Sequence, residues 1–311
     1  MLDRQAAVGA LSREGLVFRL LSEPGGGSVL YPIHHPRTIL AEQLVGMENA
    51  SKQLFQNLLG IRTGLNPLPT LIEGFRGTGK TSLALAAWQK LNTPPFPTHS
   101  SPCHLVQIAR EGIHDIVPLI DVLSETTAPS IILIDDLYFR EGDPLLHTFR
   151  GILDGGIMEF PSHVALIVTS NHRHLLEERH SLREDAIRSS EIMDETMALS
   201  DRFGLTISTW EPEMKVYMEI VLHKLLEEGA IESIPSDWAK EFSTFESLEW
   251  AVARSSNRTP LSGIFMMAKK FALERGSRSG RTATLFAKMV RRGLLEDWKE
   301  AQETVPDNLA G

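Results

Sequence analysis

The sequence predicts an α/β protein with a parallel sheet covered by helices on both faces, followed by a smaller all-helical domain. Three observations support this fold class. Between residues 69 and 210, short apolar runs alternate with stretches of helical periodicity. A glycine-rich segment, GFRGTGKTS, follows the first of these runs and precedes a helical stretch. After Trp210 the pattern is helical, with no strand-like alternation.

The individual elements follow from these patterns. Five apolar runs are the predicted strands: PTLIEG at 69–74, CHLVQIA at 103–109, SIILIDD at 130–136, HVALIVTSN at 163–171 and GLTISTW at 204–210. Helical spacing predicts helices over 81–91 and 114–125, and one or two more over 39–59. Pro212, between two glutamates, predicts the start of a helical region that continues to 292.

The same patterns predict four parts of the chain. Residues 1–37, in which Gly and Pro dominate, are expected to form an N-terminal arm. Residues 38–210 form the αβ domain and residues 211–295 the helical domain. Residues 296–311 are expected to be an acidic tail that frays.

Composition restricts the class of protein. The net charge of −9 argues against a generally basic nucleic-acid coat. Cys103 is the only cysteine, so an intramolecular disulfide is excluded and the reducing cytoplasm is the expected compartment. The first twenty residues are too charged for a signal peptide. No apolar run reaches the roughly 18 residues that a membrane span needs, so no membrane insertion is expected.

The glycine-rich segment has the spacing of a phosphate-binding loop, with Gly74, Gly79, Lys80 and Thr81 at the defining positions. Glycines let backbone N–H groups point at phosphate oxygens, and the following helix adds its partial positive charge. Lys80 is predicted to neutralise the β- and γ-phosphates of a nucleotide, and Thr81 to bind Mg²⁺ through its hydroxyl. The predicted binding segment consists of Gly74, Phe75, Arg76, Gly77, Thr78, Gly79, Lys80, Thr81 and Ser82. The alternative, a glycine-rich turn without a ligand, fits the strand-loop-helix context less well.

Two carboxylates end the third predicted strand, where ligands collect in open α/β sheets. Asp135 is predicted to be the carboxylate on the Mg²⁺ side. Asp136 is predicted to orient and polarise the attacking water, a role that Glu holds more often. The alternative is a strand that ends in a solvated acidic turn.

Two further residues complete a predicted phosphoryl-transfer site. Asn171 ends the fourth predicted strand, where its amide is placed to bind the γ-phosphate or the water; the alternative is a simple turn former. Arg202 lies just before the last strand, where it is placed to reach the nucleotide of a neighbouring subunit. The alternative for Arg202 is a surface residue paired with Asp201.

Five segments and their order resemble the motifs of AAA+ ATPases: GFRGTGKT, ILIDD, VTSN, LSDRFG and, in the helical domain, RSGRTA. Over residues 38–292, the sequence around these motifs is similar to a bacterial AAA+ family that is catalogued only as a domain of unknown function. The resemblance implies the following roles: Gly74 to Thr81 as Walker A, Asp135 and Asp136 as Walker B, Asn171 as sensor 1, Arg202 as arginine finger and Arg281 as sensor 2.

The resemblance also implies a function. The protein is expected to hydrolyse ATP with Mg²⁺ at the interfaces of a homo-oligomeric ring, a hexamer in the family, and so to remodel or regulate a protein partner. The motifs do not identify that partner. A small-molecule kinase fits less well, because it does not explain Arg202 together with a separate helical domain.

A basic stretch in the helical domain leaves an alternative open. Residues 266–292 contain one acid, Glu274, and eight basic residues: Lys269, Lys270, Arg275, Arg278, Arg281, Lys288, Arg291 and Arg292. One hypothesis is that these residues bind a DNA backbone, in a slow nucleotide-gated switch or a helicase-loader-like module. The commoner explanation is a solvated helix face that meets an acidic neighbouring subunit.

Overall fold

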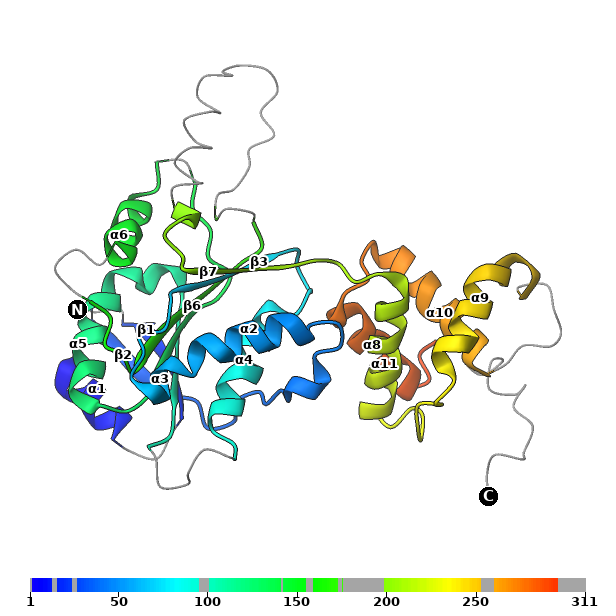
Figure 1. The fold of residues 1–311 in the computed structure, drawn as a ribbon, viewed down its shortest axis with the longest axis horizontal. Coiled ribbons are helices and arrows are strands. Elements are labelled where there is room, and N and C mark those ends of the chain that lie inside the picture. The colour runs from blue at the N-terminus through cyan, green and yellow to red at the C-terminus, as the bar shows by residue number, and fades with distance from the viewer. Residues whose placement is uncertain are drawn as a thin grey trace, which may run out of the picture. The chain divides into compact units, whose positions relative to one another are not determined.

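The computed structural model describes residues 2–12, 16–23, 27–94, 101–140, 142–154, 159–172, 175, 199–252 and 260–295, with the backbone alone at 247–252 and 260. Contacts divide the chain into two units (Figure 1). The first consists of Met1–Phe75 and Lys80–Thr209, and the second of Arg76–Gly79 and Trp210–Gly311. The acidic tail expected at 296–311 lies outside the described residues.

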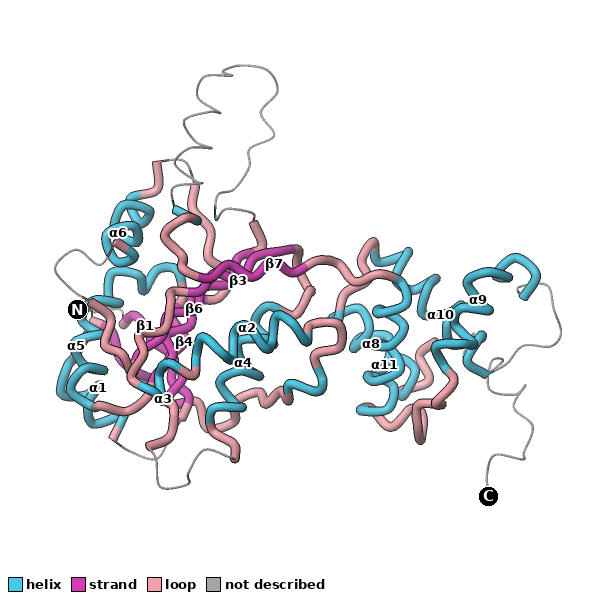
Figure 2. The backbone as a smooth tube through the Cα atoms, viewed as in Figure 1, coloured by secondary structure: helices cyan, strands magenta, loops and turns pink. Residues whose placement is uncertain are grey.

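A single sheet forms the centre of the first unit (Figure 2). In the described part of the chain it has seven strands, in the order β2-β1-β4-β5-β6-β3-β7. The strands are β1 (Val17–Ser22), β2 (Ser28–Pro32), β3 (Thr70–Gly74), β4 (His104–Ile108), β5 (Ser130–Ile134), β6 (Val164–Ser170) and β7 (Leu205–Thr209). Only the β1–β2 pair among them is antiparallel. The five predicted strands correspond to β3 through β7.

The N-terminal residues, predicted to form an arm at 1–37, contribute two strands to the sheet. β1 runs parallel to β4, with Phe18 opposite Val106, and β2 pairs with β1. Phe18 and Leu20 are buried in the core of the first unit. The Gly and Pro residues at 24–27 that suggested an arm lie, in the sequence, between these two paired strands.

Helices cover both faces of the sheet. One hydrophobic core includes residues of α1 (Arg4–Leu11), η2 (Arg110–Asp115), α5 (Ile116–Thr126) and α6 (Pro144–Leu153). A second core includes residues of α2 (Glu48–Leu58), α3 (Gly60–Thr63) and α4 (Lys80–Leu91), which follow the short η1 (Ala41–Gln43). Leu71 of β3 belongs to the first core and Ile72 to the second. Successive strand residues point to opposite faces of a sheet, so the two cores lie on its two faces. The predicted fold class, a parallel sheet with helices on both faces, is therefore confirmed.

The second unit is helical, as predicted. Its helices are α8 (Met214–Glu227), α9 (Trp238–Val252), α10 (Pro260–Arg275) and α11 (Gly280–Arg291). Tyr217, Phe242, Phe265 and Phe286 are buried at the centre of its core. α8 begins at Met214, two residues after the predicted Pro212, with Glu213 at the N-cap position. Among the helices that the structure describes in either unit, none is long and apolar enough to cross a membrane.

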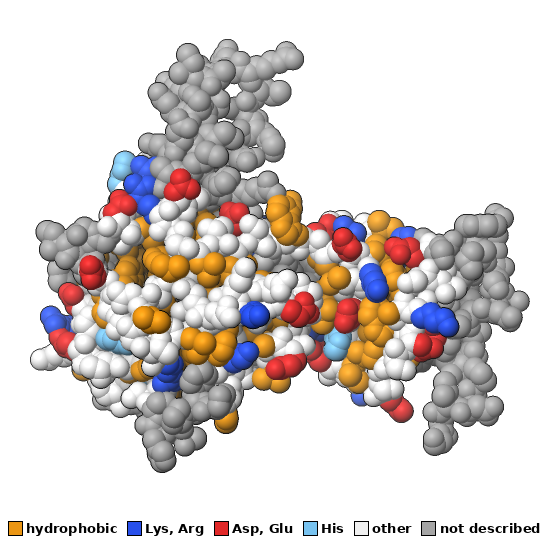
Figure 3. Space-filling view, viewed as in Figure 1, with side chains coloured by type: hydrophobic (Ala, Val, Ile, Leu, Met, Phe, Trp, Pro, Cys, Tyr) orange, Lys and Arg blue, Asp and Glu red, His pale blue; other side chains and the backbone are white. Residues whose placement is uncertain are grey.

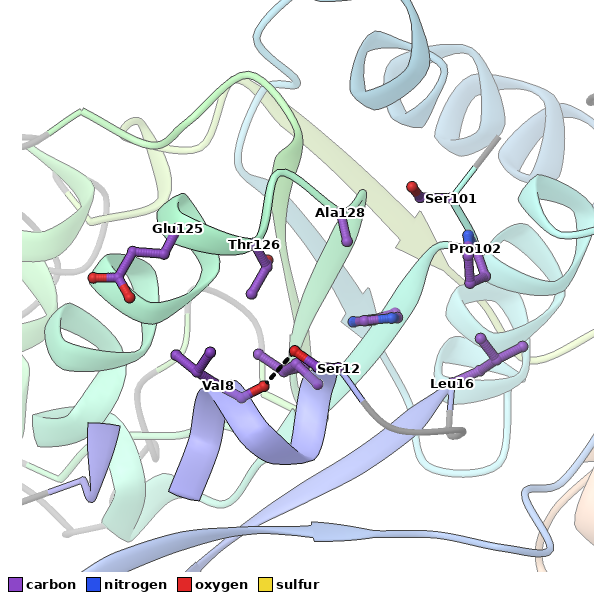
Figure 4. Close-up of a pocket in the computed structure, with 10 residues that line it drawn as sticks. Val8, Ser12, Leu16, Ser101, Pro102, Glu125, Thr126 and Ala128 are labelled. Carbon is purple, nitrogen blue, oxygen red and sulfur yellow. Dashed lines mark hydrogen bonds between the residues drawn. The ribbon is translucent and has the colours of Figure 1, made fainter. Parts of the chain in front are cut away.

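A pocket of about 680 Å³ lies in the first unit, between α1 and the connection from α5 to β5 (Figure 4). Val8 and Ser12 line it from α1 and its C-cap, and Thr126 from the end of α5. His104 lines it as well, and its Nδ1 atom is buried without a hydrogen-bond partner in the described part of the chain. The His104 ring packs edge-on against Phe18, with 5.7 Å between ring centroids. Burial lowers the pKa of His104 below its ordinary value of 6.5.

The buried His104 is expected to make the protein less stable in mild acid. Its pKa is lower in the folded than in the unfolded state, so the unfolded chain binds more protons once the pH falls below 6.5. The free energy of unfolding is therefore undiminished above this pH and decreases as the pH falls through the folded pKa. We expect His104→Gln to lose less stability than the wild type between about pH 7.5 and about pH 5.5 in urea unfolding. Equal losses in both proteins would contradict this role.

Candidate functional site

The glycine-rich segment forms a tight connection between β3 and α4. Gly74 ends β3 opposite Thr209 of β7, and a Cβ atom at Gly74 would lie 2.0 Å from the Thr209 carbonyl oxygen. A side chain at this position would therefore push the two strands apart. Gly79 has a φ of +96°, in the region that favours glycine. α4 begins immediately after Gly79, at Lys80.

This geometry fits a phosphate group. The N–H groups in the first turn of a helix have no intrahelical acceptors, and the helix dipole adds a partial positive charge there. α4 is 12 residues long, and the connection before it has glycine at the three positions where φ is positive, Gly74, Gly77 and Gly79. The predicted binding segment, residues 74–82, is this connection together with the first turn of α4.

Lys80 is buried, with only 6% of its surface exposed. Its Nζ atom donates hydrogen bonds to the carbonyl oxygens of Gly74 (2.8 Å) and Phe75 (2.7 Å) and to Oδ1 of Asn171 (2.7 Å). These three acceptors are uncharged oxygens, and they hold the ammonium in place at the start of α4. A charge held in this way, at the start of a helix, can bind an anion strongly.

Thr81 and Asp135 meet at the same point. The Thr81 hydroxyl donates to Oδ1 of Asp135 at 2.7 Å. A second hydroxyl, from Thr169 of β6, donates to the same carboxylate oxygen at 2.7 Å. Hydroxyl and carboxylate oxygens are hard ligands, which suit Mg²⁺. The Thr81–Asp135 pair therefore fits a magnesium ion whose remaining ligands are waters and phosphate oxygens.

Asp136 follows in an unusual conformation. Its φ is +60°, in the left-handed region that a non-glycine residue rarely adopts. Its N–H donates to the Thr169 hydroxyl at 2.9 Å, and its carboxylate accepts a hydrogen bond from Nδ2 of Asn171. Because Asn171 also accepts from Lys80, one amide side chain links the predicted phosphate-binding lysine to the predicted water-activating acid.

Among the residues that the structure describes, no group of three or more His, Cys, Asp or Glu side chains is placed to hold a metal ion. Mg²⁺ commonly uses one or two protein oxygens and completes its shell with waters and substrate phosphates. Thr81 and Asp135 supply what such an arrangement requires.

A family model described as "Protein of unknown function (DUF815)" matches residues 17–293, which is most of the chain. The chain belongs to this DUF815 family. The matched region begins at β1 and ends just after α11, so it includes the N-terminal strands as well as the helical unit. No curated protein matches the DUF815 chain.

Several solved structures are similar to the DUF815 chain. A point mutant of Thermotoga maritima RuvB is 15% identical and has a TM-score of 0.49, covering 86% of this chain and 72% of that one. C. elegans PCH-2 is 13% identical with a TM-score of 0.47, covering 95% and 90%. Domain III of the T. maritima replication initiation protein DnaA is 18% identical with a TM-score of 0.39, covering 80% and 95%.

The fold of the DUF815 chain agrees with the AAA+ motifs that its sequence resembles. A mostly parallel sheet carries the glycine-rich loop after β3, the acidic pair after β5 and the asparagine after β6, and a helical unit follows. The structure brings five of the predicted site residues together in the first unit: Lys80, Thr81, Asp135, Asp136 and Asn171. The order of these elements is the one that the motifs predict.

Arg202 makes an ion pair with a residue outside this group in the DUF815 chain. Its Nε atom pairs with Asp154, the C-cap residue of α6. The side chains of Arg202 and Asp154 are 31% and 48% exposed. Arg202 is therefore within reach of solvent, and its role as a finger stays a prediction.

Arg281 and the basic stretch belong to the second unit. Arg281 is exposed in the first turn of α11. Two members of the stretch are paired with acids, Arg278 with Glu211 (3.3 Å) and Lys288 with Glu228 (4.0 Å). On the face shown in Figure 3, basic and acidic side chains are interspersed over the helices of this unit. The hypothesis that the stretch binds DNA stays a prediction, as does the role of Arg281.

The sequence reading did not single out Thr169 or Asp154. Thr169 contacts both aspartates of the site, and Asp154 holds Arg202. The segment VTSN does indicate Thr169, because Thr169 is two residues before Asn171 and residues two apart on a strand lie on the same face. No comparable signal exists for Asp154, which is 48 residues from its partner.

Proposed function

We propose that this protein binds ATP together with Mg²⁺ and hydrolyses it to ADP and phosphate. The observation that carries the proposal is the convergence of Lys80, the Thr81–Asp135 pair and the Asn171–Asp136 pair. Phosphoryl transfer needs little covalent chemistry from the protein: it needs a cation and backbone N–H groups around the phosphates, a metal site, and a group that positions water. This site supplies a candidate for each.

Binding would begin with Lys80 and the start of α4. Lys80 would replace its contacts to neutral oxygens with stronger, charge-assisted contacts to the β- and γ-phosphates. Thr81 and Asp135 would hold Mg²⁺, which when bound neutralises negative charge on the phosphate oxygens. Because Thr81 and Asp135 are already in contact, little rearrangement of the chain is needed to bind this ion.

Asp136 would act in the hydrolytic step. Its carboxylate would orient a water molecule and accept its proton, while the water oxygen bonds to the γ-phosphorus and the bond to the ADP oxygen breaks. Asn171 donates to this carboxylate and would hold it in a fixed direction relative to the γ-phosphate. Asn171 also accepts a hydrogen bond from Lys80, so the contacts of its amide would change when Lys80 binds the phosphates.

The active form in this proposal is a homo-oligomeric ring, a hexamer, in which Arg202 acts on the nucleotide of a neighbouring subunit. The exposure of Arg202 supports this, because a finger must be able to leave its own subunit. The ring would use ATP to remodel or regulate a protein partner. The single cysteine favours a reducing compartment, the cytoplasm.

Phosphate release from ATP with Mg²⁺, measured over a range of protein concentrations, tests the proposal. We expect a specific activity that rises with concentration, because each site is completed by a second subunit. A low activity that does not change with concentration would favour a slow nucleotide-gated switch. No binding of ATP at any concentration would overturn the proposed function as a whole.

A further inference from the structure

We propose that Thr169 is a positioning residue whose buried hydroxyl sets the relative orientation of the two acids of the site, Asp135 and Asp136. The inference rests on the proposed function for its catalytic consequence. Thr169 itself would touch neither nucleotide nor metal. It would act through the carboxylate on the Mg²⁺ side and through the backbone of the water-activating residue.

The contacts of Thr169 reach three consecutive residues after β5. Its hydroxyl donates to Oδ1 of Asp135 (2.7 Å) and accepts from the N–H of Asp136 (2.9 Å). Its carbonyl oxygen accepts from the N–H of Leu137 (2.8 Å). Thr169 is 1% exposed, so water cannot readily take the place of these partners. One residue of the neighbouring strand β6 thus contacts all three residues that follow β5.

The direction of each hydrogen bond follows from the chemistry of the partners. A backbone N–H can only donate, so the Thr169 oxygen accepts from Asp136 and its single proton is left for Asp135. An ionised carboxylate can only accept, which satisfies that proton. A threonine or serine hydroxyl can meet both demands, whereas a valine side chain of nearly the same shape can meet neither.

The position of Thr169 follows from the sheet. Ile134, the last residue of β5, lies opposite Val168 in the parallel register, so Thr169 is next to the point where β5 ends. The chain there enters the left-handed conformation of Asp136, with a φ of +60°. If the N–H of Asp136 had no acceptor, the left-handed conformation would lose the hydrogen bond that opposes its strain. The Thr169 hydroxyl therefore joins the backbone turn to the carboxylate that would bind the metal ion.

A matched pair of variants, Thr169→Val and Thr169→Ser, tests the inference. The valine removes the hydroxyl and keeps the shape, and the serine keeps the hydroxyl and removes the methyl group. For Thr169→Val we expect kcat to fall by about 10- to 100-fold, the loss typical of residues that orient metal ligands, and the Mg²⁺ concentration for half-maximal activity to rise. ATP affinity without Mg²⁺ should change by less than about twofold, and Thr169→Ser should resemble the wild type in every measurement.

A second measurement does not depend on catalysis. Hydrogen exchange of the Asp136 amide, followed by NMR, is expected to be about tenfold or more faster in Thr169→Val than in the wild type, and nearly unchanged in Thr169→Ser. Unchanged exchange in the valine variant would overturn the inference, as would equal losses of kcat in the valine and serine variants. If the valine variant does not fold, Thr169→Ala serves in its place.

The two proposals fail in different ways. If the wild type neither binds nor hydrolyses ATP, the proposed function is wrong, and the exchange rate of the Asp136 amide still decides whether Thr169 holds this turn. If the wild type hydrolyses ATP but Thr169→Val retains its kcat and its Mg²⁺ requirement, the inference about Thr169 is wrong and the proposed function stands.

Discussion

Replacing Arg202 by alanine is expected to lower the rate of ATP hydrolysis by about 10³- to 10⁵-fold, the contribution of arginine fingers where they exist. ATP affinity should change little, because Arg202 would act on the nucleotide of another subunit and on charge that develops during the reaction. Its ion pair with Asp154 is partly exposed, and such pairs contribute about 0–1 kcal/mol. The arginine can therefore leave Asp154 at little cost when a neighbouring nucleotide offers a stronger partner.

Asp154→Asn is the matched control. It removes the charge that holds Arg202 and leaves the arginine in place, so hydrolysis should be maintained or should increase. A fall in hydrolysis in Asp154→Asn as large as that in Arg202→Ala would indicate that the ion pair itself is needed, and would contradict the finger.

A mixture of two inactive variants tests whether the finger acts between subunits. Lys80→Ala subunits would supply Arg202, and Arg202→Ala subunits would supply an intact nucleotide site. Recovery of phosphate release on mixing is expected if Arg202 of one subunit completes the nucleotide site of its neighbour. No recovery, in a mixture that forms joint oligomers, would mean that Arg202 acts within its own subunit or not at all.

Lys80→Ala is expected to weaken ATP binding by about 100-fold or more, since charge-assisted hydrogen bonds contribute about 1.5–3 kcal/mol each. The ammonium is buried at the start of α4 with three neutral acceptors, so alanine would remove this positive charge and leave the acceptors without this donor. Equilibrium binding of ATP measures the effect, and thermal unfolding checks that the variant is folded.

Asp136→Asn provides the comparison for Lys80→Ala. The asparagine keeps the size of the side chain but cannot accept the proton of the attacking water, so ATP should bind normally and hydrolysis should be lost. The two variants thus separate binding from chemistry. Normal binding in Lys80→Ala, or normal turnover in Asp136→Asn, would refute the role assigned to that residue.

Local patterns were sufficient for much of the fold. The five strands β3 to β7, the helical unit and the phosphate-loop spacing were predicted because each depends on residues that are close together in the chain. The two strands before them were missed. The apolar residues of β1 find their partners on β4, about 90 residues further on, and no spacing within the first 37 residues indicates that pairing.

The candidate site divides in the same way. The sequence by itself determined which residues are the candidates for binding phosphate and Mg²⁺, because the loop spacing and the acidic strand end are local features. Only the tertiary structure decided that Thr169 holds both aspartates, that Asn171 links Lys80 to Asp136, and that Arg202 pairs with Asp154. These contacts join residues 33 to 91 positions apart. Those of Thr169 and Asn171 exist because the order of strands in the sheet brings β3, β5 and β6 side by side.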